Sequence, residues 1–339
     1  MQEGLSFNDV LLVPKFSDVE SRADADFSTR LTDNIVLRHP LISSNMDTVT
    51  EAEMAIAIGK TGGLGVIHRY MSVEQQVREV VAVKKSGLVA AAAIGVQNED
   101  IARAFALVEA GADLLFLDIA HAHHYFTREI MEHLLDSNIG AHIIAGNVAT
   151  VEGAKYLIRL GASAIKVGIG PGSVCSTRVI TGCGVPQLTA IMNVKQAYDE
   201  LDMPARIIAD GGIQNSGDIV KAIAAGASAV MLGRLFAGCR ETPGLYTTSS
   251  RGTVKVYQGM ASGQRTPKWK DSVLKHSTPE GIKTTVKANG PVEEVVKELL
   301  RGLASGYSYC GAHTLEELQK HAEFIRVSSA GYAEGLPKS

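Results

Sequence analysis

The sequence predicts an α/β fold, a (β/α)8 TIM barrel, on three observations. Short apolar runs recur along the chain, segments with helical spacing follow them, and residues with unusual chemistry stand directly after the runs. Alternating strands and helices are typical of a parallel sheet, which eight such units close into a barrel. Barrels carry their active sites at the carboxyl ends of the strands, so the third observation fits the same fold.

Eight apolar runs are the predicted strands. They occupy residues 40–44, 64–68, 89–95, 114–119, 142–146, 164–168, 206–210 and 229–233. Short apolar runs bounded by turn residues are typical of strands in a parallel sheet. Their number is the one that a (β/α)8 barrel requires.

A segment with helical spacing follows each run, as at residues 51–60, 73–84, 99–110, 151–160 and 216–225. Three of these segments end in the same way, before a Gly-Ala-Asp or Gly-Ala-Ser triplet that begins at Gly111, Gly161 or Gly226. Glycine is preferred there because it adopts the left-handed conformation that ends a helix.

An open doubly wound sheet is the alternative fold. Such a sheet would carry a dinucleotide-binding Gly-x-Gly-x-x-Gly after its first strand, and no such motif appears there. The residues with unusual chemistry instead stand at the ends of several different runs or shortly after them: Asn45, Met46, Asp118, Asn147, Cys175, Asp210 and Gly233. This distribution favours the barrel.

Residues 239–291 interrupt the alternation, because they are rich in Gly, Ser, Thr, Lys and Arg and lack apolar periodicity. We expect a flap inserted after the eighth strand, with a solvated hairpin as the alternative. Helical spacing resumes at residues 292–304, and we expect poor order after Ala330. Residues 1–339 are expected to form one domain, without a second domain inserted.

Composition and charge exclude several classes of protein. Thirty-three basic and 36 acidic side chains give a net charge of -3, which argues against a general nucleic-acid or membrane surface. The four cysteines show no Cys-x-x-Cys spacing, so we expect neither a zinc site nor a disulfide framework. No targeting segment and no apolar run of transmembrane length is evident, so a cytoplasmic protein is expected.

The glycine-rich segment 166–178 is the most informative part of the chain. It joins an apolar run to a loop with three glycines, one proline and Cys175. Glycine lets a backbone approach a ligand closely, and a cysteine in such a loop is placed to act as a nucleophile. The alternative is a tight turn with a buried, inert cysteine.

Two further glycine motifs, at residues 210–212 and 233–234, follow the seventh and eighth runs. Barrels often hold phosphate at these two strand ends through backbone amides. Asp210 stands where a carboxylate can accept hydrogen bonds from a ribose diol. A simple turn is the alternative interpretation of each motif taken alone.

Asp118 lies near the end of the fourth run, and His121, His123 and His124 follow that run. In isolation, Asp118 could equally be a helix N-cap. The histidines have no carboxylate or cysteine at ligand spacing, which argues against a metal site.

Several long motifs stand in a fixed order, at residues 5–12, 45–49, 166–178, 209–212 and 257–260. In these motifs the chain resembles the IMP dehydrogenase and GMP reductase family over nearly its whole length. Motifs of this length in this order are highly specific.

The resemblance implies a purine nucleotide, GMP or IMP, as the substrate. It places the phosphate at Ser173, Gly212, Gly233 and Tyr257, the ribose at Asp210, and the base near Met46, Gly259 and Met260, with Ser44 also among the substrate-binding residues. Arg234 departs from the small residue expected after Gly233. Arg234 is therefore a further candidate substrate-binding residue, whose guanidinium could make a charge-assisted contact with the phosphate. The alternative is that its side chain points away from the phosphate.

The resemblance also implies a nicotinamide cofactor against Asp118, with Ala120, His121 and Asn147 nearby. A potassium ion is plausible from the family, held by the backbone carbonyls of Gly170, Gly172 and Cys175. The family likeness further suggests a homotetramer.

The catalytic residues that the resemblance implies are Cys175, Thr177 and Glu280. Purine C2 is electrophilic once a ring nitrogen is protonated, so the thiolate of Cys175 can add there to form a thioimidate. Thr177 can relay a proton, and Glu280 matches the supporting carboxylate.

The family contains two reactions that share this thioimidate. In the dehydrogenase, IMP gives hydride to NAD and water then yields XMP. In the reductase, ammonia leaves GMP and NADPH delivers hydride to give IMP.

The flap favours one of these reactions. Family dehydrogenases carry a longer flap with an Arg-Tyr pair that activates water, whereas here Glu280 stands only 20 positions after Met260. Residues 260–280 contain no Arg-Tyr pair, and their conspicuous members are Arg265 and Trp269. Asn45 and the direct passage from Lys85 to Leu88, without an inserted regulatory domain, also resemble the reductases. Residues 48–54 and 71–76 instead resemble dehydrogenase segments.

We therefore predict an NADPH-dependent GMP reductase. One alternative is an NAD-dependent IMP dehydrogenase that lacks the regulatory domain. A second is a purine-nucleotide-binding barrel without catalytic activity.

Overall fold

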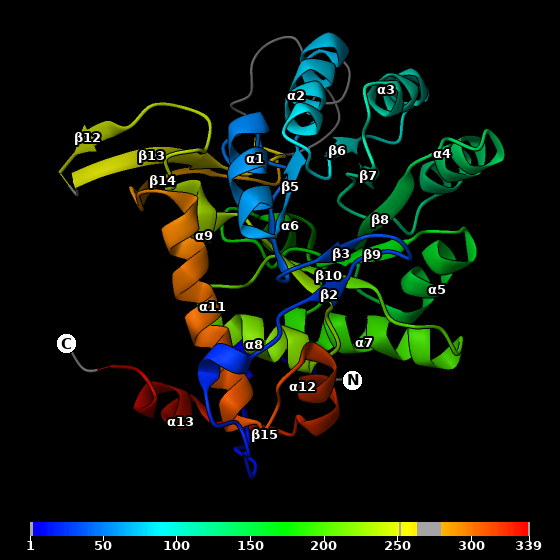
Figure 1. Cartoon of the computed structure of the whole chain (residues 1–339). Helices are drawn as coiled ribbons and strands as arrows, with labels where there is room; N and C mark the ends of the chain where they lie inside the picture. Colours follow the sequence, from blue (N-terminus) through cyan, green and yellow to red (C-terminus); the bar gives the residue numbers. More distant parts are fainter. Residues whose placement is uncertain (1–2, 251, 263–278, 338–339) are drawn as a thin grey trace.

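A closed barrel of eight parallel strands forms the centre of the protein (Figure 1). The structure is a computed structural model that describes residues 3–250, 252–262 and 279–337. The barrel strands are β4 (Leu41–Ser43), β5 (Leu64–Ile67), β6 (Ala91–Ile94), β7 (Leu114–Leu117), β8 (His142–Val148), β9 (Ala164–Val167), β10 (Ile207–Asp210) and β11 (Ala229–Leu232). Each predicted run overlaps one of these strands, so the predicted (β/α)8 TIM barrel is confirmed.

Helices cover the outside of the barrel (Figure 1). The long ones are α1 (Ala52–Thr61), α2 (Val73–Lys85), α3 (Asn98–Glu109), α4 (Tyr125–Asp136), α5 (Val151–Arg159), α7 (Gln187–Glu200), α8 (Ser216–Ala224) and α11 (Val292–Tyr309). Two short helices, α6 (Thr177–Thr181) and α9 (Arg234–Ala237), directly follow loops at the barrel mouth. Gly111, Gly161 and Gly226 have φ of 99°, 91° and 114°, which is the left-handed conformation expected at the ends of α3, α5 and α8.

Two layers of apolar side chains form the core. One layer fills the barrel interior and includes Phe116, Ile208 and Met231, and the other lies between the strands and the helices. The short hairpin of β2 (Thr29–Arg30) and β3 (Val36–Leu37) contributes Leu37 to the interior layer. Thr29 also donates a hydrogen bond to the carbonyl of Ser228, directly before β11, so the hairpin closes the amino-terminal end of the barrel.

A segment near the start of the chain pairs with one near its end. Strand β1 (Val10–Leu12), which follows the 3-10 helix Phe7–Asp9, pairs antiparallel with β15 (Phe324–Arg326). A second 3-10 helix (Arg22–Asp24) follows β1, and α12 (Leu315–His321) precedes β15. The expectation of poor order after Ala330 is wrong for α13 (Ser329–Glu334), because the hydroxyl of Ser328 accepts a hydrogen bond from the amide of Gly331 and caps this helix.

A three-stranded antiparallel sheet occupies the described part of the flap. Its strands are β12 (Thr247–Ser249), β13 (Gly252–Gln258) and β14 (Lys283–Lys287), and it projects from one side of the barrel (Figure 1). The sequence did not predict these strands, because β12 and most of β14 are exposed on both faces and carry no apolar alternation. Arg265 and Trp269 lie outside the described residues.

Within the described part of the chain, no helix combines the length and the apolar character that crossing a membrane requires.

Truncating a side chain in the barrel interior should be costly. Phe116 is 0% exposed, so we expect Phe116→Ala to lower the free energy of unfolding by about 3–5 kcal/mol, because it removes buried apolar surface and leaves a cavity. Phe105→Ala on α3 is the control, since Phe105 is 40% exposed; it should cost about 0.5 kcal/mol or less. Urea unfolding followed by circular dichroism measures both, and equal losses would contradict the assigned interior.

Candidate active site

Cys175, Thr177 and Glu280 form a hydrogen-bonded chain at the barrel mouth. The thiol of Cys175, which is exposed, donates to Oγ1 of Thr177 at 3.2 Å. The Thr177 hydroxyl donates to Oε2 of Glu280 at 2.6 Å. A proton can therefore pass from the thiol through the Thr177 hydroxyl to the carboxylate of Glu280. Loss of this proton converts the thiol to the nucleophilic thiolate.

Backbone hydrogen bonds between the Cys175 loop and the flap hold this chain in place. The amide of Ser176 donates to the carbonyl of Glu280 at 2.9 Å, and the amide of Ile282 donates to the carbonyl of Val174 at 3.0 Å. Gly259 lies against the same carbonyl, where a Cβ would come within 2.7 Å of it, so only glycine fits there. The flap thus supplies both the carboxylate and the backbone that fixes the loop.

The residues expected to bind phosphate come from neighbouring loops and from strand β13, and the region between them is called the phosphate space below. These residues are Ser173, Gly212, Gly233 and Tyr257. Tyr257 on β13 is only 3% exposed, and its hydroxyl is hydrogen-bonded to Ser173. A Cβ at Gly233 would lie 2.7 Å from Oη of Tyr257. Burial raises the pKa of Tyr257, although the bond with Ser173 acts in the opposite direction, so the phenol stays protonated and can donate a hydrogen bond.

The glycine pair after β10 completes this space. Gly211 and Gly212 have φ of 89° and 81°, which only glycine adopts readily. A Cβ on Gly211 would lie 3.1 Å from the amide nitrogen of Gly172, so the pair packs directly against the Cys175 loop. The two glycine-rich loops therefore lie in direct contact.

Asp210 at the end of β10 is anchored by two donors. Nζ of Lys166 lies 2.8 Å and Nδ2 of Asn147 lies 3.0 Å from the same carboxylate oxygen, Oδ2. Lys166 is 3% exposed and the ion pair is largely buried, so each charge depends on the other. The sequence motifs did not predict this role of Lys166, although a lysine inside the apolar run 164–168 is an unusual residue that signals it.

Asn147, expected near the cofactor, thus lies beside Asp210. Its Nδ2 also donates to the carbonyl of Gly168 at 2.7 Å. Its Oδ1 is buried and has no hydrogen-bond partner among the described residues. A buried acceptor of this kind fits a donor on a ligand, such as the amide nitrogen of a nicotinamide.

Asp118 after β7 forms an ion pair that the sequence did not predict. Nε of Arg69, from the loop after β5, lies 3.3 Å from Oδ2 of Asp118, and the guanidinium also lies over the ring of Tyr70. The N-cap interpretation of Asp118 is wrong, because His124 caps the following helix α4. Ala120 and His121 are exposed in the same loop, and partial burial and then the neighbouring histidines lower the pKa of His121.

The residues expected near the base lie on both sides of the mouth. Ser44 and Met46 are buried after β4, and a Cβ on Gly233 would lie 3.2 Å from Sδ of Met46. The side chain of Gln258 donates to Asp47 at 3.1 Å, which joins the loop after β4 to β13. Gly259 and Met260 directly follow that strand, and Met260 is half-buried.

The histidines after β7 and the Cys175 loop were the two places where the sequence raised the question of a metal ion. Within the described ranges, no group of His, Cys, Asp and Glu could hold a metal ion. His123 instead packs against Tyr156, with ring centres 4.8 Å apart. The carbonyl of Gly172 accepts the amide of Cys175 at 3.0 Å, and a potassium ion on Gly170, Gly172 and Cys175 stays a prediction of the resemblance.

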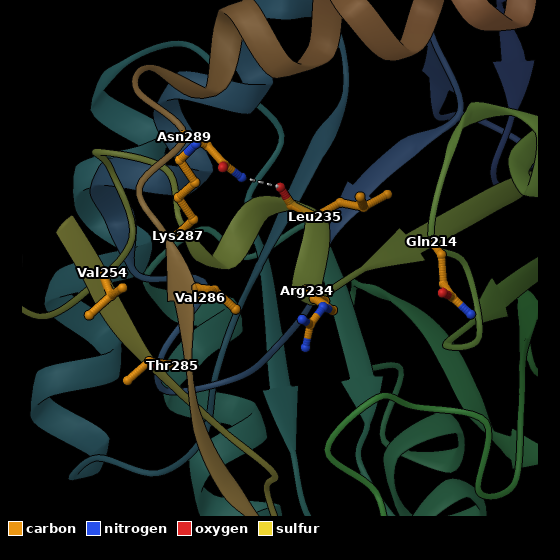
Figure 2. Close-up of a pocket in the computed structure, with 8 residues that line it drawn as sticks. All are labelled: Gln214, Arg234, Leu235, Val254, Thr285, Val286, Lys287 and Asn289. Carbon is orange, nitrogen blue, oxygen red and sulfur yellow. Dashed lines mark hydrogen bonds between the residues drawn. The ribbon is translucent and has the colours of Figure 1, made fainter. Parts of the chain in front are cut away.

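Arg234 is exposed at the start of α9, where it lines a hollow of about 470 Å³ (Figure 2). The guanidinium makes no hydrogen bond or ion pair with the described residues. Its positive charge nevertheless acts on Tyr257, whose pKa it lowers slightly against the effect of burial. Arg234 therefore stands beside the space that Tyr257 and Gly233 enclose.

Thiol reactivity tests the assigned exposures. Cys175 and Cys183 are exposed, whereas Cys239 and Cys310 are buried; burial raises the pKa of Cys239 to about 12 and also raises that of Cys310. Because the thiolate is the reactive form, we expect a disulfide reagent at pH 8 to modify two thiols quickly and the other two only after denaturation. Cys175→Ser and Cys183→Ser should each remove one fast thiol. Four fast thiols in the folded protein would contradict the burial.

Known proteins resemble this chain over nearly its whole length. The model of a family described as "IMP dehydrogenase / GMP reductase domain" matches residues 4–338. An IMP dehydrogenase from Cryptosporidium parvum is 40% identical over 384 aligned residues, which cover 98% of this chain and 94% of that protein. A GMP reductase from Leishmania donovani is 32% identical over 476 aligned residues, which cover 98% and 96%.

A solved structure is similar over the full length. It is a cysteine-to-alanine variant of GMP reductase from Trypanosoma brucei in complex with guanosine 5'-monophosphate. The TM-score is 0.92 at 30% sequence identity, and the match covers 100% of this chain and 98% of that one.

Proposed function

Because the chain belongs to the IMP dehydrogenase / GMP reductase family, and so to a family of oxidoreductases of purine metabolism, we propose that it converts GMP to IMP and ammonia with NADPH. The observation that carries this proposal is the hydrogen-bonded chain from Cys175 through Thr177 to Glu280. It supports both a nucleophile and a route for its proton. A barrel that only bound nucleotide would not need this arrangement.

The three residues suit the release of ammonia. The thiolate of Cys175 adds to C2 of the purine, and the thiol proton passes through Thr177 to Glu280. Glu280 then gives a proton to the amino group, the bond between C2 and this nitrogen breaks, and ammonia leaves a thioimidate. NADPH supplies the hydride that C2 accepts, after which the bond between carbon and sulfur breaks and IMP is released.

The remaining site residues hold the substrate in this scheme. The phosphate lies between Ser173, Gly212, Gly233 and the hydroxyl of Tyr257, which stays protonated because burial raises its pKa. Asp210 is anchored at Oδ2, so its Oδ1 is left to accept from the ribose hydroxyls. Ser44, Met46, Gly259 and Met260 surround the base.

The cofactor is proposed to lie against Asp118, Ala120, His121 and Asn147. The buried, unpartnered Oδ1 of Asn147 supports this placement, since it can accept a hydrogen bond from the carboxamide of a nicotinamide. A single catalytic barrel without an inserted regulatory domain, a homotetramer, and a potassium ion on the loop carbonyls complete the proposal.

IMP dehydrogenase is the second candidate function. Relatives named as IMP dehydrogenases are as similar to this chain as those named GMP reductases, with 33% and 40% identity against 32%. The absence of an Arg-Tyr pair between residues 260 and 280 favours the reductase, because water activation in the dehydrogenase needs a base.

Paired assays at 340 nm separate the two reactions. With GMP and NADPH we expect the absorbance to fall while IMP and ammonia form, and with IMP and NAD we expect no change. Cys175→Ala should abolish turnover but still bind GMP, because the thiol is the nucleophile and does not hold the phosphate. A rise in the second assay alone would identify a dehydrogenase, and no change in either would favour a binding protein.

Replacement of the carboxylate should slow one step selectively. We expect Glu280→Gln to lower kcat by about 10²-fold, because the amide cannot take the proton from Thr177. Ammonia release then limits turnover, so the isotope effect on kcat with 4-deuterated NADPH should fall toward one. Thr177→Ser, which keeps the hydroxyl, is the control and should retain most of the activity. An unchanged isotope effect in Glu280→Gln would contradict the role in ammonia release.

A further inference from the structure

The hollow beside Arg234 lies outside the space assigned to the first phosphate. It has a volume of about 470 Å³ and is bounded by α9, by β13 and β14 of the flap, and by the loop after β10. Figure 2 shows Arg234 between Gln214 on one side and Val286 on the other, with Lys287 and Asn289 on the wall formed by β14 and the residues after it.

The lining of the hollow carries uncompensated positive charge. The side chains of Arg234 and Lys287 are exposed and form no hydrogen bond or ion pair with the described residues. No acidic side chain among those residues lines the hollow. Gln214 adds a side-chain amide, while Asn289 is occupied by a hydrogen bond of 3.2 Å to the carbonyl of Leu235. Two cations and an amide without a carboxylate partner suit an anion.

Two residues that line the hollow are close in sequence to glycines of the proposed phosphate site. Arg234 directly follows Gly233, and Gln214 is the second residue after Gly212. The charge of Arg234 also acts on Tyr257, whose hydroxyl lies against Gly233. A ligand whose first phosphate lies at Gly212 and Gly233 would therefore direct any second phosphate toward Arg234.

We propose that the hollow is a subsite for the second phosphate of a guanosine 5'-diphosphate, held by Arg234 and Lys287. The inference rests on the proposed function, since it places the guanosine and the first phosphate as in the scheme for GMP. Guanosine 5'-diphosphate then binds at the same site as GMP and competes with it. The apolar wall of Val254, Val286 and Leu235 strengthens the attraction by excluding water from one side of the charges.

Isothermal titration of GMP and of guanosine 5'-diphosphate tests the subsite without requiring turnover. We expect the wild-type protein to bind the diphosphate at least as tightly as GMP. Lys287→Gln should weaken binding of the diphosphate by about 10-fold, the size of one charge-assisted contact at the second phosphate, while the affinity for GMP changes by less than about 3-fold. Arg234→Gln should weaken binding of the diphosphate by about 10-fold more than it weakens binding of GMP. Lys283→Gln is the control, because Lys283 is an exposed lysine on the same strand that does not line the hollow.

Three results would overturn the subsite. An unchanged affinity for the diphosphate in both variants would mean that the hollow holds no phosphate. An equal loss for GMP and for the diphosphate would place Arg234 in contact with the first phosphate. Inorganic phosphate that binds to the GMP-saturated protein, together with a diphosphate that binds more weakly than GMP, would identify a free anion as the occupant.

Failure of the proposed function gives a different pattern. If GMP binds but the assay at 340 nm shows no change in absorbance, the reductase activity is wrong while the titrations still decide the subsite. If neither nucleotide binds to the wild-type protein, the proposed function and the subsite both fail. Melting curves by circular dichroism should be unchanged in both variants, since Arg234 and Lys287 are exposed.

Discussion

Closure of the eight-stranded barrel is the constraint on which the rest of the structure depends. Pairing of β11 with β4 leaves no open edge, so the carboxyl ends of all eight parallel strands meet at one mouth. The register of the strands then fixes which side chains meet. Lys166 on β9 lies opposite Ile208 on β10, and Asp210 is two residues further on the same face, so the lysine reaches the carboxylate.

The buried pair of Lys166 and Asp210 shows how the barrel builds a polar site on an apolar scaffold. A charge in this position is costly unless it is paired and hydrogen-bonded. Lys166 and Asn147 both donate hydrogen bonds to one carboxylate oxygen of Asp210. The buried apolar side chains of the barrel interior, among them Phe116 and Ile208, stabilise the fold and offset the free-energy cost of burying these charges. The result is a carboxylate of fixed orientation at the mouth.

The flap is coupled to the barrel through the backbone as well as through side chains. Glu280 contacts the Cys175 loop twice, by its carboxylate at Thr177 and by its carbonyl at Ser176. One residue of the flap therefore both supplies the carboxylate and is hydrogen-bonded to the backbone of the loop. Strand β13 of the same flap carries Tyr257, which is hydrogen-bonded to Ser173 of the Cys175 loop, and β14 carries Lys287, which lines the hollow. The three-stranded sheet therefore contributes to both the proposed phosphate site and the hollow.

The sequence by itself determined the barrel and the glycine caps, because apolar periodicity and glycine-rich turns are local patterns. The candidate site residues were proposed from motifs that resemble a known family. Only the tertiary structure decided which distant residues meet. Thr177 and Glu280 stand 103 positions apart, and the partners Arg69 and Lys166 carry no local motif that reveals Asp118 or Asp210 as their counterparts. The strands β12 and β14 of the flap also depend on tertiary contacts, because their sequences show no apolar alternation. The position of Arg234 beside the flap is likewise visible only in the tertiary structure.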